Sequence, residues 1–262
     1  MTKFFVISDV HGFYEEMREA LDKAGFDPNN EEHWLVSCGD CLDRGRQPRQ
    51  VINYLTSLPR KILIKGNHES LMMDCLQREF PYNHDWHNGT AQTIIDLPPY
   101  ANTFDEACAT VYWGVSKFID GMVNYFETQN YIFVHAFVPL NCEDNLPPYI
   151  TSNRKYSKMD NWREAHAMQW EDARWGNPLE LAEQGLLPDK TLVFGHWNAS
   201  AGWAEFEGRS EFGEDAKHEP FYGDGFIAID ACTARSGVVN VVVIEDEMLG
   251  VDDNYNEENM EH

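Results

Sequence analysis

The chain has 262 residues, of which 43% are hydrophobic and 13% aromatic, so it can bury a sizeable core and does not have the composition of a disordered protein. Its formal net charge of −24 argues against nucleic acid as a partner, because a polyanionic backbone would be repelled. The longest apolar runs, at residues 4–7 and 238–244, are far shorter than the roughly 20 residues of a membrane helix, and the first ten residues lack the apolar stretch of a secretory signal. We therefore expect a cytoplasmic protein that binds neither nucleic acid nor a membrane.

The N-terminal part of the chain alternates between strand and helix patterns. Short apolar runs predict strands over residues 3–8, 34–38 and 61–65. Apolar side chains at helical spacing predict helices over 13–24 and 48–58, and a third helix through 71–76. This order predicts parallel strands joined by right-handed crossovers.

The pattern is less regular after residue 80. We expect a loop over 80–100, a helix over 104–119, and two strands at 122–127 and 131–138 joined by a tight turn. Mixed loop and helix over 142–190 precede a buried strand at 191–194, and 197–225 is predicted to be a surface excursion. A closing hairpin is predicted from strands at 225–230 and 238–245.

These patterns favour a single domain over residues 1–245, with helical or loop insertions around 80–120 and 142–190 that cap it. Acidic residues without basic neighbours dominate 246–262, which predicts a solvated tail. The six cysteines are widely spaced and are expected to be free thiols. Cys38 and Cys41 form a C-x-x-C, so zinc binding or redox chemistry is a minor alternative there.

Polar residues of a few types recur where the predicted strands end. Because the carboxyl ends of strands in an open α/β sheet face a common crevice, these residues should converge although they lie far apart in the chain. They are Asp9 and His11 after the first strand, Asp40, Asp43 and Arg44 after the second, Asn67 and His68 after the third, His135 within a later strand, and His196 after the strand at 191–194.

The residue types indicate metal-assisted chemistry on phosphate. Aspartate, asparagine and histidine suit manganese, iron or zinc, and a carboxylate such as Asp40 can bridge two ions that clamp an in-line displacement at phosphorus. Arg44 offers a planar fork for phosphate oxygens. His68 can protonate a leaving alkoxide if Asp43 orients its ring. Each residue also has a structural alternative: Asp43 and Arg44 could form a surface ion pair, Asn67 could cap a helix, and His135 and His196 could be core histidines.

The motifs D-x-H at Asp9, G-D-x-x-D-R-G from Gly39 and G-N-H-E from Gly66, with the later His135 and Gly195-His196, resemble the phosphoprotein phosphatase branch of the calcineurin-like metallophosphoesterases. The resemblance implies a four-layer α-β-β-α sandwich of two mixed sheets flanked by helices. It implies that Asp9, His11 and Asp40 hold one divalent ion and that Asp40, Asn67, His135 and His196 hold a second. It also implies that His68, paired with Asp43, is the general acid, and that Arg44 and Asn67 contact substrate.

The match departs from the eukaryotic pattern. Ala136-Phe137 follows His135 where eukaryotic members have two glycines, and Gly195-His196 is similar to bacterial and phage-type members. A second phosphate-binding arginine is expected before His196, for which Arg174 is the first candidate and Arg154 and Arg163 are alternatives. His84 and His87 could line the substrate entrance.

We therefore expect a phosphoester hydrolase with two divalent ions, Mn²⁺ first and Fe or Zn as alternatives. The leading substrate is phosphoserine or phosphothreonine in a protein. The alternative is symmetrical hydrolysis of a dinucleoside tetraphosphate, which would use the same catalytic residues. A catalytically silent binding module is the third hypothesis, and oligomeric state remains open.

Overall fold

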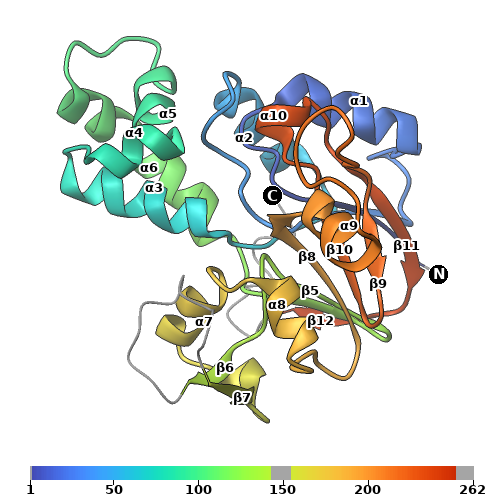
Figure 1. The fold of residues 1–262 in the computed structure, drawn as a ribbon. Coiled ribbons are helices and arrows are strands. Elements are labelled where there is room, and N and C mark those ends of the chain that lie inside the picture. The colour runs from blue at the N-terminus through green and yellow to red at the C-terminus, as the bar shows by residue number, and fades with distance from the viewer. Residues whose placement is uncertain (1, 143–154, 252–262) are drawn as a thin grey trace.

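Two β-sheets lie face to face in the computed structural model, which describes residues 2–142 and 155–251, and helices cover the outer faces of the sheets (Figure 1). The first sheet has the order β11-β1-β2-β3, and the second has the order β12-β4-β5-β8-β10-β9. Both sheets mix parallel and antiparallel pairs. The strands of the first sheet are β1 (Thr2–Ile7), β2 (His33–Ser37), β3 (Lys61–Leu63) and β11 (Val242–Asp246). Those of the second are β4 (Phe126–Thr128), β5 (Tyr131–Phe133), β8 (Thr191–Asn198), β9 (Phe221–Gly223), β10 (Phe226–Asp230) and β12 (Met248–Val251).

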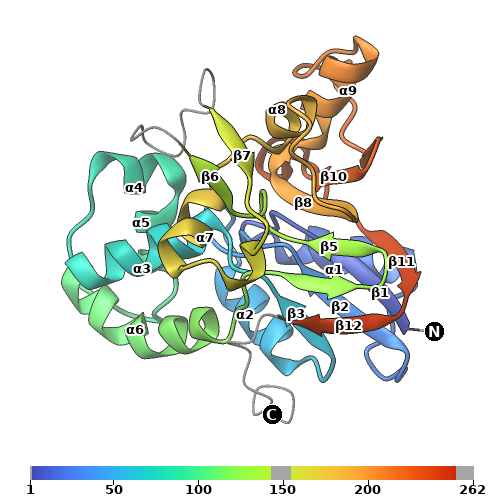
Figure 2. The same ribbon diagram turned by 90° about the horizontal axis from the view of Figure 1, so that it is seen from below.

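Helices α1 to α9 fall into three groups (Figures 1 and 2). Helices α1 and α2 lie against the first sheet, α3 to α6 form a lobe to one side, and α7 to α9 lie beside the second sheet, where β6 and β7 make a small separate hairpin. The helices are α1 (Tyr14–Ala24), α2 (Pro48–Ser57), α3 (Asn67–Arg78), α4 (Asn83–Asn88), α5 (Thr90–Asp96), α6 (Phe104–Asp120), a 3₁₀ helix (Trp162–Glu164), α7 (Ala167–Ala173), α8 (Pro178–Glu183), α9 (Ala199–Glu207) and α10 (Thr233–Ser236). The two strands of the small hairpin are β6 (Leu140–Cys142) and β7 (Tyr156–Lys158).

Side chains alternate between the two faces of each strand, and this alternation produces the layers of the sandwich. In β1, Phe4 and Val6 belong to the core between the two sheets, whereas Phe5 and Ile7 belong to the core beneath α1 and α2. Successive side chains of a strand point to opposite faces, so one short apolar run serves both cores. The rings of Phe4 and Phe126 lie 5.3 Å apart between the sheets. The predicted four-layer sandwich is confirmed.

The N-terminal predictions hold closely. Strands β1, β2 and β3 pair in parallel, with Phe5 opposite Leu35 and Val36 opposite Ile62. The hairpin of β4 and β5 also forms at the predicted turn. The six cysteines are free.

Two segments predicted as loops contain helices. Residues 83–96 form α4 and α5, which meet at Gly89, whose φ of 85° ends the first helix. The asparagines and glycine that indicated a loop mark the ends of short helices instead. Residues 199–207 likewise form α9 within the predicted surface excursion.

The predicted closing hairpin is wrong. Strand β10 pairs with β8 and β9 in the second sheet, whereas β11 pairs with β1 in the first. The chain between them includes α10 and crosses from one sheet to the other. The chain also remains ordered into strands beyond residue 246, because β12 pairs with β4; residues 252–262 of the predicted acidic tail lie outside the described residues.

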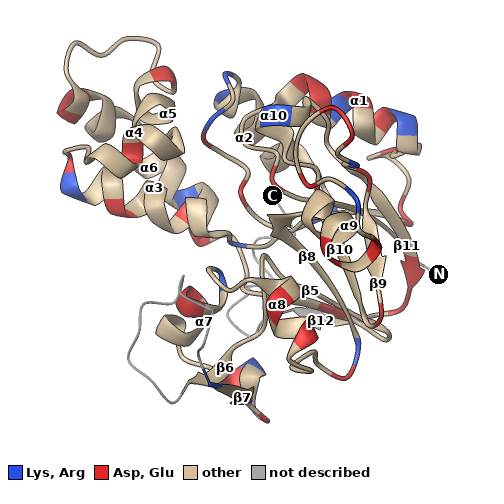
Figure 3. Ribbon diagram, in the orientation of Figure 1, with Lys and Arg blue, Asp and Glu red and all other residues tan. Residues whose placement is uncertain are grey.

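The chain has 44 acidic and 20 basic residues, and the red ribbon segments that mark Asp and Glu lie on helices in each part of the fold in Figure 3. Among the described residues, no helix combines the length and apolar character needed to cross a membrane.

Candidate active site

Strand ends from both sheets surround a cavity of about 470 Å³. Asp9 and His11 follow β1, Asp40 follows β2, Asn67 begins α3 directly after β3, and His196 lies in β8. His135, which follows β5, is buried behind the cavity, with its Nε2 2.8 Å from Asn67 Oδ1. The predicted convergence is therefore present. The cavity is lined by Asp9, His11, Asp40, Arg44, Asn67, His68, His87, His196, Asn198, Phe212, Asp230, Cys232, Ala234 and Arg235.

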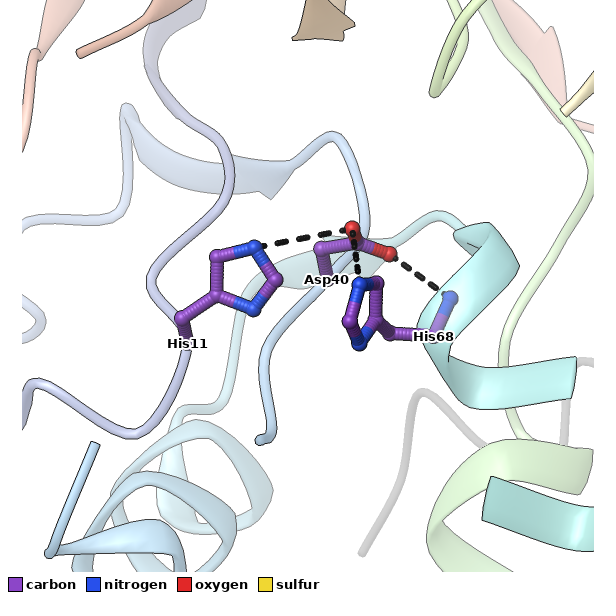
Figure 4. Close-up of side chains that lie close together, drawn as sticks. All are labelled: His11, Asp40 and His68. Atoms are coloured by element: carbon purple, nitrogen blue, oxygen red, sulfur yellow. Dashed lines mark hydrogen bonds and ion pairs between the residues drawn. The ribbon is translucent and has the colours of Figure 1, made fainter. Parts of the chain in front are cut away.

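Asp40 lies at the centre of two clusters of possible metal ligands. In one, Asp40 Oδ2 is 3.7 Å from His11 Nε2 and 3.9 Å from His68 Nε2 (Figure 4). In the other, Asp40 Oδ1 is 3.4 Å from His135 Nε2, and Asp9 completes the group. Because each oxygen of Asp40 faces a different cluster, its carboxylate can be shared between two ions.

Backbone carbonyls set the tautomers of two histidines. His11 Nδ1 donates to the carbonyl of Leu42 at 2.9 Å, and His135 Nδ1 donates to that of Cys38 at 2.8 Å. Burial lowers the pKa of both rings well below the usual value, and burial with the neighbouring His68 lowers the pKa of His196 to about 3. The rings are therefore neutral, with Nε2 of His11 and His135 unprotonated and directed into the clusters.

The donor set fits divalent cations. Burial raises the pKa of Asp9 and Asp40 well above the usual range, and Asp230 and Asp9 respectively add repulsion between like charges. The unprotonated His135 Nε2 faces the amide oxygen of Asn67, so two lone pairs oppose each other. The site thus gathers carboxylate, imidazole and amide acceptors with too few hydrogen-bond donors between them. A bound cation would stabilise such a site.

The loops that carry these residues have unusual backbone conformations. Seven of the eight non-glycine residues with positive φ in the described chain belong to the site: Asp9, His11, Asp40, Asp43, Arg44, His196 and Cys232. Such conformations cost on the order of 1–3 kcal/mol each and persist only where the surroundings enforce them.

Glu69 is one source of that enforcement. Its buried carboxylate accepts hydrogen bonds from the backbone N–H groups of Asp40, Cys41 and Gly66, at 2.8–2.9 Å. These bonds join the loop after β2 to the loop after β3. The same loops approach so closely that a Cβ on Gly66 would lie 2.2 Å from Asp40 Oδ1.

Arg44 lies between two imidazoles. Its two terminal nitrogens donate to His11 Nε2 and His68 Nε2, each at 3.1 Å. On the other side of the His68 ring, Nδ1 is 2.7 Å from Asp43 Oδ2, which also accepts a hydrogen bond from the hydroxyl of Thr90. Burial raises the pKa of Asp43 to about 7, and burial with Arg44 lowers the pKa of His68 to about 3, so both shifts favour an uncharged pair.

Arg174 does not line the cavity. Its guanidinium hydrogen-bonds to Glu171, to the side-chain oxygen of Asn124 and to the carbonyl of Lys65. Of the two alternatives, Arg163 pairs with Glu127, and Arg154 lies outside the described residues. Of the two histidines that could line the substrate entrance, His87 lines the cavity, whereas His84 lies beside Asp85.

Sequence reasoning missed several lining residues. Asp230 is not among the residues predicted for the site, yet it is buried at the cavity, where burial raises the pKa of its carboxyl to about 6. Its place at the end of a strand is the signal shared with Asp9 and Asp40. Asn198, Phe212, Cys232, Ala234 and Arg235 had no comparable signal.

The family model of calcineurin-like phosphoesterases matches residues 2–223, which include all the residues of the two clusters. The chain belongs to this family. A calcineurin-like phosphoesterase is a hydrolase of phosphoester bonds, as expected from the sequence. The cysteine-based alternative has no support, because Cys38 and Cys41 are buried and burial raises the pKa of both thiols.

Curated relatives match only part of the chain. A symmetrical bis(5'-nucleosyl)-tetraphosphatase of Buchnera aphidicola is 39% identical over 70 residues, which are 26% of this chain and 24% of that protein. The protein of the same name from Dechloromonas aromatica is 28% identical over 102 residues, 38% of this chain and 36% of its own length. The matched segment thus spans about a quarter to a third of these relatives.

Solved structures match over nearly the whole chain. A putative diadenosine tetraphosphatase has a TM-score of 0.54 at 14% identity, covering 93% of this chain and 89% of its own. A cold-active protein-tyrosine phosphatase of a Shewanella species has a TM-score of 0.54 at 16% identity, covering 94% and 76%. At these identities the similarity shows the fold alone.

Proposed function

We propose that this phosphoesterase uses two divalent ions, held by Asp9, His11 and Asp40 on one side and by Asp40, Asn67, His135 and His196 on the other. The observation that carries the proposal is the position of Asp40: one of its oxygens faces the neutral imidazoles of His11 and His68, and the other faces the neutral imidazole of His135, with Asp9 beside it. Manganese suits this mixture of carboxylate, amide and imidazole donors, and iron or zinc are alternatives.

When bound, two such ions activate water as a nucleophile and stabilise the charge that develops on phosphate oxygens. The protein residues orient the substrate beside them. If His11 Nε2 served as a metal ligand, Arg44 would release that nitrogen, and one arm of its fork would be free for a phosphate oxygen. Asn67, at the start of α3, borders the same space.

His68 acts as the general acid in this proposal. Its Nδ1 is fixed by Asp43, and its Nε2 faces the cavity, where it accepts a hydrogen bond from Arg44. When Arg44 turns to the phosphate, Nε2 is free to carry a proton and to deliver it to the oxygen that leaves phosphorus. The hydroxyl of Thr90 holds the Asp43 carboxylate in place from α5. Asp43 therefore serves as a positioning residue.

We infer that the substrate is a dinucleoside polyphosphate cleaved symmetrically. Two observations support this choice over a phosphoprotein. The matched relatives are symmetrical bis(5'-nucleosyl)-tetraphosphatases, and a cavity of about 470 Å³ has the size of a site for a whole small molecule. Phosphoserine or phosphothreonine in a protein remains the second candidate, on the strength of the G-D-x-x-D-R-G and G-N-H-E motifs.

A side-by-side turnover assay tests both parts of the proposal. Metal-stripped protein is reconstituted with Mn²⁺ and supplied with diadenosine tetraphosphate or a phosphothreonine peptide. We expect faster formation of ADP than of phosphate, and loss of turnover with Asp40→Asn. Faster release of phosphate from the peptide would transfer the function to phosphoproteins, and full activity of the Asp40→Asn protein would contradict the shared-carboxylate site.

A further inference from the structure

The wall of the cavity formed by Phe212 and Arg235 has no role in the chemistry described above. Phe212 lies in the loop between α9 and β9, and Arg235 lies in α10. Both side chains line the cavity, and Arg235 Cζ is 5.4 Å from the centroid of the Phe212 ring. Phe212 is 56% exposed, so its ring is accessible to a ligand in the cavity.

Arg235 forms no ion pair with any carboxylate in the part of the chain that the structure describes. Arg78, Arg163 and Arg174 each have an acidic partner, whereas Arg235 is among the arginines whose charge is available to a ligand. Cys232 lines the same cavity, and both Arg235 and Arg44 are near enough to its thiol to oppose the rise in pKa that burial causes. The cavity therefore has one cation near the metal clusters and a second toward its rim.

The segments that carry the two residues are held in place. Asn240 donates from its side-chain amide to the carbonyls of His218 and Ile229, at 2.7 and 3.1 Å, and so joins the Phe212 loop to β10. Helix α10 starts after Cys232, whose backbone N–H donates to Asp230. Both segments are hydrogen-bonded to β10 or to the residues that follow it, and these bonds help to fix the position of Phe212 relative to Arg235.

We propose that Arg235 and Phe212 bind the part of the substrate beyond the scissile phosphoryl group and thereby determine specificity. Arg235 would pair with a second phosphate, and Phe212 would contact the ring of a nucleoside. This inference rests on the proposed function, in which Arg44 binds the phosphoryl group that is attacked. An arginine fork suits phosphate oxygens, and an aromatic side chain stacks on any base.

A simple phosphomonoester has neither feature and should not need this wall. A phosphopeptide has no obligatory ring or second phosphate at a fixed distance. A nucleoside polyphosphate has both, so it is the substrate class that this pair of side chains matches.

The test compares Arg235→Ala, Arg235→Lys, Phe212→Ala and Phe212→Tyr with Arg209→Ala. Arg209 is an exposed arginine in the same loop as Phe212 that does not line the cavity, so it controls for loss of positive charge. Mn²⁺-loaded proteins are assayed with diadenosine tetraphosphate and with β-glycerophosphate, a phosphomonoester without a ring. For the dinucleotide we expect Arg235→Ala to raise KM about tenfold or more with little change in kcat, and Arg235→Lys to recover part of the loss. Phe212→Ala should raise the same KM while Phe212→Tyr keeps it near wild type, and turnover of β-glycerophosphate should stay within about twofold for every variant.

Equal losses on both substrates, or no effect on the dinucleotide, would overturn the inference. If the wild type cleaves neither phosphate compound, the proposed function fails, and calorimetric binding of ADP decides the inference separately. Weaker ADP binding by Arg235→Ala than by Arg209→Ala would then support it, and equal or absent binding would refute it.

Discussion

His68 has two nitrogens with different surroundings, and this asymmetry separates its role from that of the other histidines in the site. Nδ1 of His11 and His135 is fixed by a backbone carbonyl, whereas Nδ1 of His68 is fixed by the carboxylate of Asp43. A carboxylate partner can stabilise a protonated ring when a proton must be held, which a carbonyl does less well. His68 therefore fits proton transfer better than permanent ligation, although its Nε2 is 3.9 Å from Asp40.

Replacing His68 with asparagine should separate proton transfer from metal binding. We expect His68→Asn to lower kcat by about 10²- to 10⁴-fold with a substrate whose leaving group needs a proton. Metal content, measured by mass spectrometry after gel filtration, should remain that of the wild type. Asp43→Asn should cause a smaller loss, because it disturbs only the orientation of the ring. Loss of metal from the His68→Asn protein would instead make His68 a ligand.

Glu69 permits a second prediction at this scale. Glutamine at position 69 keeps one acceptor oxygen but directs an N–H₂ group at backbone N–H donors, so at least one buried donor loses its partner. We expect Glu69→Gln to lower the free energy of unfolding by about 2–3 kcal/mol and to weaken binding of Mn²⁺. Urea unfolding and calorimetric titration with Mn²⁺ measure the two effects. Wild-type values for both would show that these hydrogen bonds do not maintain the site.

At the scale of elements, the site depends on how closely β8 approaches the end of β1. A Cβ built on Gly195 of β8 would lie 1.8 Å from Ser8 Oγ and 2.1 Å from Asp9 Oδ2, although the φ of Gly195 is not positive. The backbone N–H of the next residue, His196, donates to the same Asp9 oxygen at 2.9 Å. The glycine thus brings the metal-binding parts of the two sheets together.

Gly195→Ala should therefore force the two sheets apart at the site. We expect a loss of about 1–3 kcal/mol in the free energy of unfolding, together with weaker Mn²⁺ binding. Gly114→Ala is the matched control, since a Cβ there meets nothing within 4 Å in the middle of α6, and it should stabilise the protein by about 0.5–1 kcal/mol. Chemical unfolding of both variants makes the comparison, and a Gly195→Ala protein as stable as the wild type would contradict the close approach.

The pairing of strands that follow one another in the chain was predictable, whereas the pairing of strands with distant partners was not. The strands β1, β2 and β3 pair with their neighbours in sequence, so apolar runs and helical spacing were enough. The final strands show the same apolar runs, but nothing local indicates that β10 joins β8 while β11 crosses to β1. The predicted hairpin failed because proximity in sequence was the only information available.

The residues of the site likewise divide into those that the sequence could identify and those that it could not. Asp9, Asp40, Asn67 and His196 could be found because each is a polar residue at or near the end of an apolar strand, and strand ends meet. Asp230 carried that signal and was overlooked. Arg235 and Phe212 come from a short helix and an irregular loop, where position depends on tertiary contacts such as those of Asn240.

At the scale of the whole molecule, the chain has a net charge of −24 and few basic side chains. Some of these basic side chains form ion pairs between separate segments of the fold. Glu127 of β4 shows this arrangement. It pairs with Arg163 of the 3₁₀ helix at 2.7 Å and with Lys190, which precedes β8 and also donates to the carbonyl of Thr128. One carboxylate thus links the 156–190 segment to the second sheet. Burial alone would raise the pKa of Glu127, but the hydrogen bonds from Arg163 and Lys190 outweigh it and lower the pKa.

The lowered pKa fixes the pH range in which this link acts. A carboxyl group whose pKa is lower in the folded state stabilises that state above its unfolded value, here 4.5, and the contribution is lost as pH falls through the folded value. We expect Glu127→Gln to be less stable than the wild type by about 1 kcal/mol at pH 7, after allowance for screening of partly exposed charges, and the difference to vanish in acid below the lowered pKa. Glu164→Gln removes the same charge from an exposed residue beside Arg163 and is the control for net charge. Urea unfolding of EDTA-treated proteins between pH 7 and pH 3 provides the measurement, with metal release kept out of the comparison. If relief of net negative charge dominated instead, both variants would be at least as stable as the wild type at pH 7, and the link through Glu127 would have no measurable effect.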